Sequence, residues 1–431
     1  MILYSLGIWT YRQGVRAAAL AGHHKASLLD AGLRRTLPAL KERLADAGTQ
    51  DNSPKETVWI HAASLGEFEQ GRPLIERLRR ERPGTRIVLS FFSPSGYEVR
   101  KNYSEADAVV YLPFDTPRNV RRFLDAVRPT CAIFVKYEFW LNYLSELKRR
   151  GIPTYLISGI FRPSQLFFRP YGGFYRNALK AFTTLYLQDE GSRRLLEGIG
   201  VTNTEVAGDT RFDRVTDIMK TAREDDALTR FCGRGPARGA TGERTPGTDL
   251  IFIAGSSWPE DESNYAGWLR DTPGVKGIIA PHEFSPERLA KMLELFEGEG
   301  VLLSGARKDP SLLDTHKVLI MDCFGMLASA YAYADIAYVG GGFGAGLHNI
   351  NEAAVYGIPV IYGPNNAKFI EAQEMKATGG GIEVHSREDF RREASRLIAD
   401  DAYRLDLGRR SAAYITSRLG ATSRIFDSLF R

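Results

Sequence analysis

The chain has 431 residues, of which 43% are hydrophobic and 25% charged, so its composition is that of a globular protein and excludes a disordered or fibrous one. This length predicts two domains or three. The three cysteines lie far apart, which excludes a disulfide framework and a zinc knuckle and fits a reducing cytoplasm. No stretch approaches the roughly 18–20 apolar residues of a membrane-spanning helix.

Positive charge gathers at the N-terminus. The whole chain has a net charge of +5, and residues 1–46 alone carry seven Lys and Arg against three acids. Leu, Ile, Trp and Tyr precede most of these cations, a combination that suits the surface of an anionic membrane. We therefore predict that residues 1–46 form a membrane-associating segment. The alternative is a helix that packs on its own domain with a basic face in solvent. A signal peptide is not indicated, because the apolar run is short and no basic residues precede it.

Short apolar runs alternate with amphipathic stretches up to residue 214. The runs predicted as strands are 57–64, 86–93, 108–113, 131–137, 153–159 and 183–188. Strands separated by helical segments indicate βαβ units and a parallel sheet covered on both faces. Residues 47–214 are therefore predicted to form one Rossmann-like domain.

A second alternation follows a break that is rich in Gly, Pro and Arg. We interpret residues 222–248 as a disordered loop just inside a second domain, 215–431. Helices are expected from about residue 387 onward, after strands at 250–257, 277–281, 301–305, 317–323, 336–342, 359–363 and 381–385. The predicted fold is α/β, with two doubly wound Rossmann-like domains that face a central cleft at the carboxyl ends of their strands.

A glycine-rich segment, Gly340–Gly346, is the strongest candidate ligand site. Glycines let the backbone approach a ligand, and a helix starting near His348 would offer unpaired N–H groups to a phosphate or diphosphate. Glu352, about one turn into that helix, is placed to accept hydrogen bonds from a ribose. The spacing matches neither the dinucleotide nor the P-loop fingerprint. The structural alternative is a tight turn, with His348 as a helix cap and Glu352 complementing the helix dipole.

Two carboxylates follow buried strands of the first domain. Glu67 lies in the first turn of the helix after 57–64, and Glu138 comes just after 131–137. A carboxylate at the carboxyl end of a strand can act as a general base when a substrate hydroxyl reaches it. The alternative for both is an acid that complements the dipole of the following helix.

Further polar residues are expected at strand ends. Arg211, near the domain junction, suits a phosphate or a carboxylate, and its alternative is an ion pair with an acid such as Asp213. Pro281 and His282 end a strand of the second domain. The scattered histidines form no metal set, and the Arg tracts lack the interleaved aromatic residues of a nucleic-acid surface. We therefore expect nucleotide-sugar chemistry without a metal and no nucleic-acid partner.

Several motifs occur in a fixed order along the chain. They are HAASLGE (61–67), YLPFD (111–115), YEFWLN (137–142), GDTRFD (208–213) and GLHNINE (346–352), followed by Gly363-Pro364 and Phe369. They resemble the H-[AS]-[VA]-S-x-G-E, YLPxD, TELWPN, G-x-x-K-F-D and GHNxxE motifs of the 3-deoxy-D-manno-octulosonic acid (Kdo) transferases. These are inverting glycosyltransferases of the GT-B fold that act in lipid A biosynthesis. The resemblance covers essentially the whole chain.

The resemblance implies transfer of Kdo from CMP-Kdo to a lipid A precursor, lipid IVA, at the cytoplasmic face of the inner membrane and without a cofactor. It makes 47–214 the acceptor domain and 215–431 the CMP-Kdo domain. Glu67 matches the family's catalytic base and Glu138 its transition-state-stabilising acid, and Arg211 stands in place of a stabilising lysine. The residues implied to contact CMP are Pro281, His282, Phe324, Gly325, Met326, Asn349, Ile350, Asn351 and Glu352.

This sequence departs from the family pattern at several positions. Lys136 replaces a common acid, Leu141 replaces the proline of the tryptophan motif, and His282 replaces an arginine. Two other functions remain as alternatives: an isomerase similar to the UDP-GlcNAc 2-epimerases, and a non-catalytic protein that binds a nucleotide sugar or a lipid.

Overall fold

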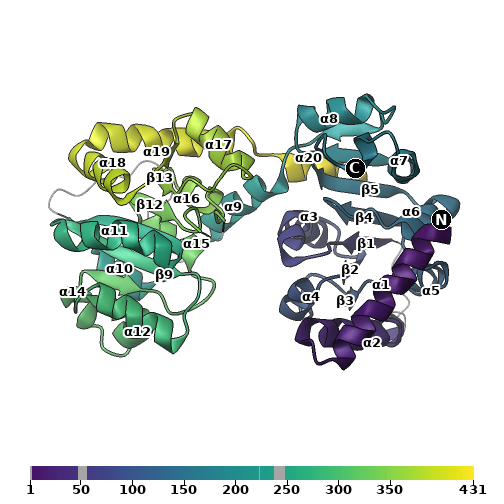
Figure 1. Cartoon of the computed structure of the whole chain (residues 1–431), viewed down its shortest axis with the longest axis horizontal. Helices are drawn as coiled ribbons and strands as arrows, with labels where there is room; N and C mark the ends of the chain where they lie inside the picture. Colours follow the sequence, from purple (N-terminus) through teal and green to yellow (C-terminus); the bar gives the residue numbers. More distant parts are fainter. Residues whose placement is uncertain (1, 47–55, 223, 237–247, 345) are drawn as a thin grey trace. The chain divides into compact units, whose positions relative to one another are not determined.

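The computed structural model describes residues 2–46, 56–222, 224–236, 248–344 and 346–431 (Figure 1). The chain divides into two compact units. The first runs to Arg214 and also contains Leu419–Arg431, and the second is Val215–Arg418. Each unit holds one seven-stranded sheet. The prediction of two doubly wound Rossmann-like domains is therefore confirmed.

The sheet of the first unit is parallel throughout, with the order β3-β2-β1-β4-β5-β6-β7. Its strands are β1 (Thr57–His61), β2 (Arg86–Phe91), β3 (Ala108–Tyr111), β4 (Cys131–Val135), β5 (Thr154–Gly159), β6 (Thr184–Leu187) and β7 (Thr204–Val206). Its helices are α1 (Ile2–Leu20), α2 (His24–Asp46), α3 (Leu65–Glu81), α4 (Pro94–Arg100), α5 (Pro117–Val127), α6 (Leu141–Arg149), η1 (Leu166–Phe168), α7 (Gly173–Leu179), α8 (Glu190–Glu197) and α20 (Ala421–Phe430), and α9 (Thr210–Thr221) contains the boundary. The predicted strands are confirmed, and β7 is an additional short one.

Helices cover both faces of this sheet, which explains why its central strands are apolar on both sides. Trp59 of β1 packs with Phe123 and Tyr143 on one face. Ile60, its neighbour in β1, points to the other face and belongs to the same cluster as Phe68 of α3. Alternate residues of one strand therefore hold two helical layers in place.

The N-terminal helices pack on the first unit. Leu29 and Leu40 of α2 are buried, and the Thr36 hydroxyl donates a hydrogen bond to the Tyr111 carbonyl at 3.0 Å. This packing agrees with the structural alternative for residues 1–46, and their membrane association stays a prediction. Among the described residues, no helix is long and apolar enough to cross a membrane.

The C-terminal helix α20 lies with the first unit, so the predicted boundary of 215–431 is wrong at its far end. Figure 1 shows α20, in yellow, beside α3. Ile425 and Phe426 are buried in the core under α3, and Asp213 accepts the backbone N–H groups of Gly420 and Thr422, both at 2.7 Å. Periodicity predicted a helix here but carried no information on the partner it packs against.

The sheet of the second unit is also parallel, with the order β10-β11-β9-β8-β12-β13-β14. Its strands are β8 (Leu250–Ser257), β9 (Val275–Pro281), β10 (Gly300–Leu302), β11 (Val318–Ile320), β12 (Ile336–Val339), β13 (Val360–Tyr362) and β14 (Gly381–Glu383). Its helices are α10 (Asp226–Cys232), α11 (Pro259–Asp271), α12 (Pro286–Leu295), α13 (Leu303–Ala306), α14 (Leu312–Thr315), α15 (Leu327–Ala330), η2 (Tyr331–Tyr333), α16 (Asn351–Ala354), α17 (Ile370–Ala377), α18 (Arg387–Ala399) and α19 (Asp401–Thr416). Each predicted strand has a counterpart here, although the one predicted at 301–305 is shorter.

Two local predictions for the second unit need correction. The segment 222–248 was predicted as a disordered loop, but its residues 226–232 form α10, whose first turn is capped by the Asp225 carboxylate; residues 237–247 lie outside the described part. The strand predicted at 301–305 ends at Leu302, and α13 follows it directly.

In each sheet the strand order reverses at one point. The reversal lies between β1 and β4 in the first sheet and between β8 and β12 in the second. Open α/β sheets bind their ligands outside the carboxyl ends of the strands that flank such a reversal. Glu67 follows β1 and Glu138 follows β4, while the glycine-rich turn follows β12. Topology therefore places the predicted candidates at the expected positions of the two sheets.

Asp115, the last residue of the YLPFD motif, connects three parts of the first unit. Its carboxylate is fully buried and accepts the backbone N–H groups of Asn142 and Tyr143, each at 3.0 Å, and the Tyr4 hydroxyl at 2.8 Å. The first two bonds satisfy the opening turn of α6, and the third attaches α1. Burial raises the pKa of Asp115 to about 6.

We expect Asp115→Asn to destabilise the first unit by about 2–3 kcal/mol, because a buried amide NH2 would face a group that is itself a donor. Chemical denaturation followed by circular dichroism measures this loss. Tyr4→Phe is the matched control, since it removes one donor and should lower the free energy of unfolding by only about 1 kcal/mol. Equal losses in the two variants would contradict the assignment.

Candidate active site

The first group of candidate residues lies at the carboxyl ends of β1 and β4. Glu67 occupies the third position of α3, where its Oε2 accepts the Ser64 backbone N–H at 2.9 Å and the Ser64 hydroxyl at 3.2 Å. The predicted structural alternative, a first-turn acid, thus describes part of its role. Both bonds use the same oxygen, so Oε1 accepts no hydrogen bond from the residues that the structure describes.

The surroundings of Glu67 favour its protonated form. Burial raises the pKa of its carboxyl group, and the negative charge of Glu138 raises it further. The bonds from Ser64 act in the opposite direction, because they stabilise the ionised form. The ionisation of Glu67 therefore depends on a second carboxylate that follows a neighbouring strand, a frequent arrangement in active sites.

Glu138 is held by a buried histidine and a tryptophan. Its Oε2 lies 2.5 Å from the indole Nε1 of Trp140 and 3.1 Å from Nε2 of His61. An indole N–H can only donate, so Trp140 orients the carboxylate as a hydrogen-bond acceptor. The side chain of Glu138 is 12% exposed, and its Oε2 is held by His61 and Trp140.

His61 is the residue of this group that sequence reasoning missed. It is fully buried at the end of β1, and its Nδ1 lies 2.9 Å from the Ser90 hydroxyl and 3.1 Å from the Ser90 carbonyl. Both ring nitrogens are thus engaged, one by β2 and the other by Glu138 and Trp140. The available signal was a histidine at the end of a strand that is otherwise apolar.

Arg211 lies in the first turn of α9 and forms its ion pair with Asp209, not with Asp213. The guanidinium contacts the Asp209 carboxylate at 2.6 Å, and the backbone N–H of Arg211 donates to the same side chain at 2.9 Å. Burial raises the pKa of the Tyr137 hydroxyl, and the charges that act on it belong to Arg162, Arg211, Glu67 and Asp189. The structure therefore brings Arg211 to the same region as Glu67.

The glycine-rich turn of the second unit packs backbone against backbone. A Cβ on Gly340 would lie 2.3 Å from the Ser256 carbonyl oxygen, and a Cβ on Gly342 would lie 2.6 Å from the backbone nitrogen of Gly363. Gly341 has a φ of 89°, which disfavours other residues. The packing of the turn accounts for these three glycines without a ligand.

A buried carboxylate holds this turn in place. Asp261 of α11 accepts the backbone N–H of Gly341 at 2.8 Å and the Tyr338 hydroxyl at 2.8 Å. Burial raises the pKa of Asp261, which is fully enclosed. The turn is therefore a rigid platform at the end of β12.

Three aromatic rings gather beside that platform. The His282 ring stacks on Trp258 with centroids 4.4 Å apart, and it lies 4.7 Å from the ring of His348. The Trp258 Nε1 donates to Nε2 of His348 at 3.2 Å. Burial and the proximity of His282 lower the pKa of His348. The structure thus brings His282 together with the residue that precedes Asn349, while Pro281 is buried at the end of β9.

The helix after the glycine-rich turn begins later than predicted. It was expected to start near His348, but α16 is Asn351–Ala354, and the His348 N–H donates back to the Gly340 carbonyl at 3.1 Å. Glu352 accepts a hydrogen bond from the Asn349 side chain at 3.1 Å. A helix of one turn has little dipole, so anion binding here would depend on individual groups.

The other predicted nucleotide contacts surround this short helix or follow β11. Ile350 and Asn351 are buried, and the Asn351 side-chain oxygen accepts no hydrogen bond from the described residues. Phe324 is 83% exposed, Gly325 has a φ of 82°, and Met326 contacts the Arg307 guanidinium through its sulfur at 3.3 Å. An exposed phenylalanine at a strand end is available to stack on a planar ligand.

Within the described residues, no group of three or more His, Cys, Asp or Glu side chains could hold a metal ion.

Comparisons with known proteins show which family this chain is similar to. Residues 38–214 match the model of the 3-Deoxy-D-manno-octulosonic-acid transferase (kdotransferase) family. A 3-deoxy-D-manno-octulosonic acid transferase of Bordetella pertussis is 28% identical over 399 residues, which cover 90% of each chain. The transferase of Haemophilus influenzae is 26% identical over 409 residues, 91% of this chain and 92% of that one. This chain is a glycosyltransferase related to the Kdo transferases.

A solved structure supports the fold independently of this relationship. The UDP-GlcNAc 2-epimerase from Neisseria meningitidis has a TM-score of 0.59 and 15% sequence identity, and the match covers 86% of this chain and 99% of that chain. At this identity the likeness concerns the fold alone. It confirms the GT-B architecture expected from the resemblance to Kdo transferases.

We expect Glu67 to titrate above the ordinary range of a glutamate in carbon-13 NMR of labelled glutamate side chains, because burial and Glu138 both disfavour its charge. Glu138→Gln removes a negative neighbour and should lower the pKa of Glu67. Ser64→Ala removes a donor to the ionised form and should raise it. The resonance is assigned by its absence in Glu67→Gln. Shifts in the same direction in Glu138→Gln and Ser64→Ala would contradict this account.

Proposed function

We propose that this glycosyltransferase moves Kdo from CMP-Kdo to a sugar hydroxyl of a lipid A precursor, lipid IVA, with inversion at the anomeric carbon. The observation that carries the proposal is the pair of carboxylates at the reversal point of the first sheet. Glu67 has a raised pKa and one oxygen without a partner among the described residues, while Glu138 is held by Trp140 and His61. One carboxylate is thus placed to exchange a proton and the other to remain fixed.

In the proposed reaction Glu67 is the general base. The acceptor hydroxyl oxygen forms a bond to the anomeric carbon of Kdo, and its proton passes to Glu67. The bond between that carbon and the phosphate oxygen breaks, and CMP leaves with the electron pair. Because the raised pKa of Glu67 is closer to neutral than that of an ordinary glutamate, the ionised side chain is a stronger base.

Glu138 and Arg211 are proposed to stabilise charge that develops during transfer. Positive charge grows on the Kdo ring as the phosphate departs, and a carboxylate with a fixed orientation lowers the free energy of that state. Trp140 supplies part of this orientation through its 2.5 Å bond. Arg211 is oriented by Asp209 and carries a planar guanidinium suited to phosphate oxygens.

The donor is proposed to bind the second unit at the carboxyl ends of β8, β9, β11 and β12. No metal or cofactor is part of the proposal. The residues proposed to contact CMP are Pro281, His282, Phe324, Gly325, Met326, Asn349, Ile350, Asn351 and Glu352. Of these, the Asn349–Glu352 pair offers an amide and a carboxylate for the ribose hydroxyls, and His282 and Phe324 offer aromatic surfaces for the base.

We expect Glu67→Gln to reduce the transfer rate by about 10²–10⁴-fold, the usual contribution of a general base. Glutamine also fits the third position of a helix in a capping box, so the variant should fold. Mass spectrometry of the lipid product from CMP-Kdo and lipid IVA measures transfer, and calorimetry should show unchanged CMP-Kdo affinity. Glu69→Gln, the same change two residues further along α3, is the control and should retain activity.

The outcome of this assay separates the alternative functions. Turnover retained by Glu67→Gln would refute its role as the base. Absence of transfer by the wild-type protein, together with epimerisation of UDP-GlcNAc, would favour the isomerase. Binding of a nucleotide sugar with no turnover of either substrate would favour a non-catalytic protein.

We further propose that α1 and α2 associate with the anionic surface of the inner membrane, on its cytoplasmic side. Leu6, Trp9 and Leu20 of α1 are 56%, 53% and 91% exposed. Burial and the neighbouring Arg16 and Arg34 lower the pKa of Arg12, while Asp30 acts in the opposite direction, so Arg12 lies near two further cations of α1 and α2. Apolar side chains beside cations suit a peripheral contact with anionic lipid.

We expect a Leu6→Gln and Trp9→Gln double variant to bind phosphatidylglycerol vesicles at least about tenfold more weakly, since the polar side chains lose apolar burial. Co-sedimentation measures the binding, and added salt should weaken it further. Leu405→Gln, an exposed leucine of α19, is the control and should bind like the wild type. Equal binding by all three proteins would exclude α1 as the contact.

A further inference from the structure

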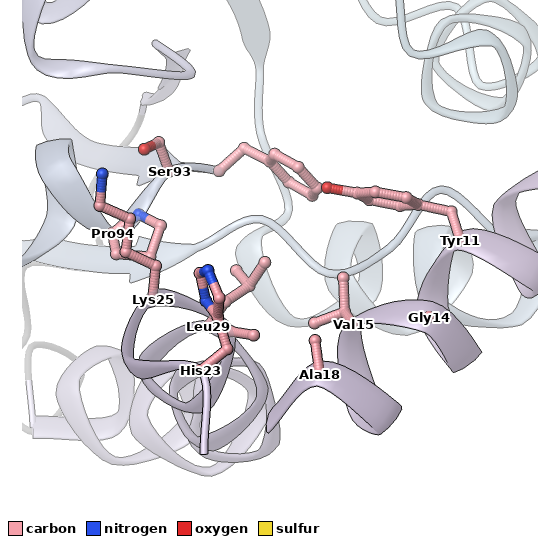
Figure 2. A pocket seen from close by; sticks show the side chains of 11 residues that line it. Tyr11, Gly14, Val15, Ala18, His23, Lys25, Leu29, Ser93 and Pro94 are labelled. Atoms are coloured by element: carbon pink, nitrogen blue, oxygen red, sulfur yellow. The ribbon is translucent and has the colours of Figure 1, made fainter. Parts of the chain in front are cut away.

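A pocket of about 520 Å³ lies between α1, α2 and the turn that follows β2. Its lining includes Tyr11, Gly14 and Val15 of α1, Lys25 and Leu29 of α2, and Phe92 after β2. Figure 2 shows Tyr11 and Val15 of α1 on one side and Lys25 with Pro94 on the other. The volume is within the range of about 300–1,000 Å³ that is typical of small-molecule sites.

The lining is apolar along most of its length and positively charged at one edge. Val15, Ala18 and Leu29 supply methyl groups, and Tyr11 supplies an aromatic ring. Lys25 is the charged residue of the lining, which includes no carboxylate. An apolar trough with a cation at its edge fits a long hydrocarbon chain that ends in an anionic group.

A series of aromatic contacts leads from the pocket to a residue of the candidate active site in the same unit. The Tyr11 ring lies 6.3 Å from the ring of Phe92, and Phe92 lies 4.7 Å from the ring of Trp140. Trp140 in turn donates to Glu138 at 2.5 Å. Phe92 therefore lines the pocket and also contacts the tryptophan that holds Glu138.

We propose that this pocket binds one fatty acyl chain of the acceptor glycolipid, with an anionic group of that lipid near Lys25. The inference rests on the proposed function and deepens it, because it gives the acyl chain a site on the protein. Binding the chain beside Phe92 would hold the sugar hydroxyl of the same molecule near Glu67. Acceptor recognition would then depend on acylation as well as on the sugar.

Two glycines of α1 provide a matched pair of variants. A Cβ built on Gly14, which lines the pocket, meets no atom within 4 Å, and the same holds for Gly7, which does not line it. Both lie in the interior of one helix, two turns apart on the same face. Gly14→Phe should therefore fill the pocket without a backbone clash, and Gly7→Phe introduces the same ring outside it.

The first measurement is independent of any transfer activity. The full-length protein is titrated with cis-parinaric acid, a fluorescent long-chain fatty acid. We expect the wild type and Gly7→Phe to bind it, and Gly14→Phe to bind at least about tenfold more weakly, which corresponds to the exclusion of about two methylene groups. Equal binding by the three proteins, or none by the wild type, would overturn the proposal. Thermal denaturation checks that both variants are folded.

The second measurement compares lipid IVA with its fully deacylated form as acceptors. We expect Gly14→Phe to lower the ratio of kcat/KM for the acylated over the deacylated acceptor by about tenfold, while Gly7→Phe keeps the wild-type ratio. A ratio that is unchanged in Gly14→Phe would overturn the acyl site and leave the proposed transfer intact. Loss of transfer from the wild type would refute the proposed function, and the fatty-acid titration would still decide the pocket.

Discussion

The buried Asp115 carboxylate is the contact on which the geometry of the first unit depends. It satisfies the backbone N–H groups of Asn142 and Tyr143, which fixes where α6 begins. The residue before α6 is Trp140, whose indole holds Glu138. A single buried acceptor thus helps to fix the position of a proposed catalytic carboxylate that is more than twenty residues away in the chain. The acidic residue of the YLPFD motif therefore has a structural role.

Most of the fold could be predicted from the sequence, because parallel strands buried on both faces are apolar throughout and the helices between them are amphipathic. The predicted strands are present, and Glu67 and Glu138 lie at strand ends as expected. Predictions failed where the outcome depends on contacts between distant segments. The helix after Gly346 begins at Asn351 and not near His348, whose N–H bonds back to Gly340, and α20 joins the first unit through Asp213.

Among the proposed catalytic residues, too, some could be predicted from local sequence pattern and others could not. Local pattern identified the two carboxylates and Arg211, since each follows a strand or begins a helix. It did not identify His61, whose importance arises from the 3.1 Å approach to Glu138 and from its bonds to Ser90 on the neighbouring strand. The structural alternative for Arg211 was an ion pair with an acid such as Asp213, and the structure pairs it with a different acid, Asp209. A residue's role at a site is thus set by register and rotamer, which periodicity does not encode.

Glu67 combines two demands that oppose each other. As a helix cap it is stabilised in its ionised form by the Ser64 donors, which lowers its pKa. As a base it benefits from burial and from Glu138, which raise the pKa, and the net shift is upward. Because both cap bonds use Oε2, the structure separates the demands by atom: one oxygen anchors the side chain, and the other accepts no bond from the described residues. The anchor gives the base a fixed direction, and the electrostatic field of its neighbours gives it proton affinity. This division explains how a residue that fits an ordinary first-turn position can also be the reactive one.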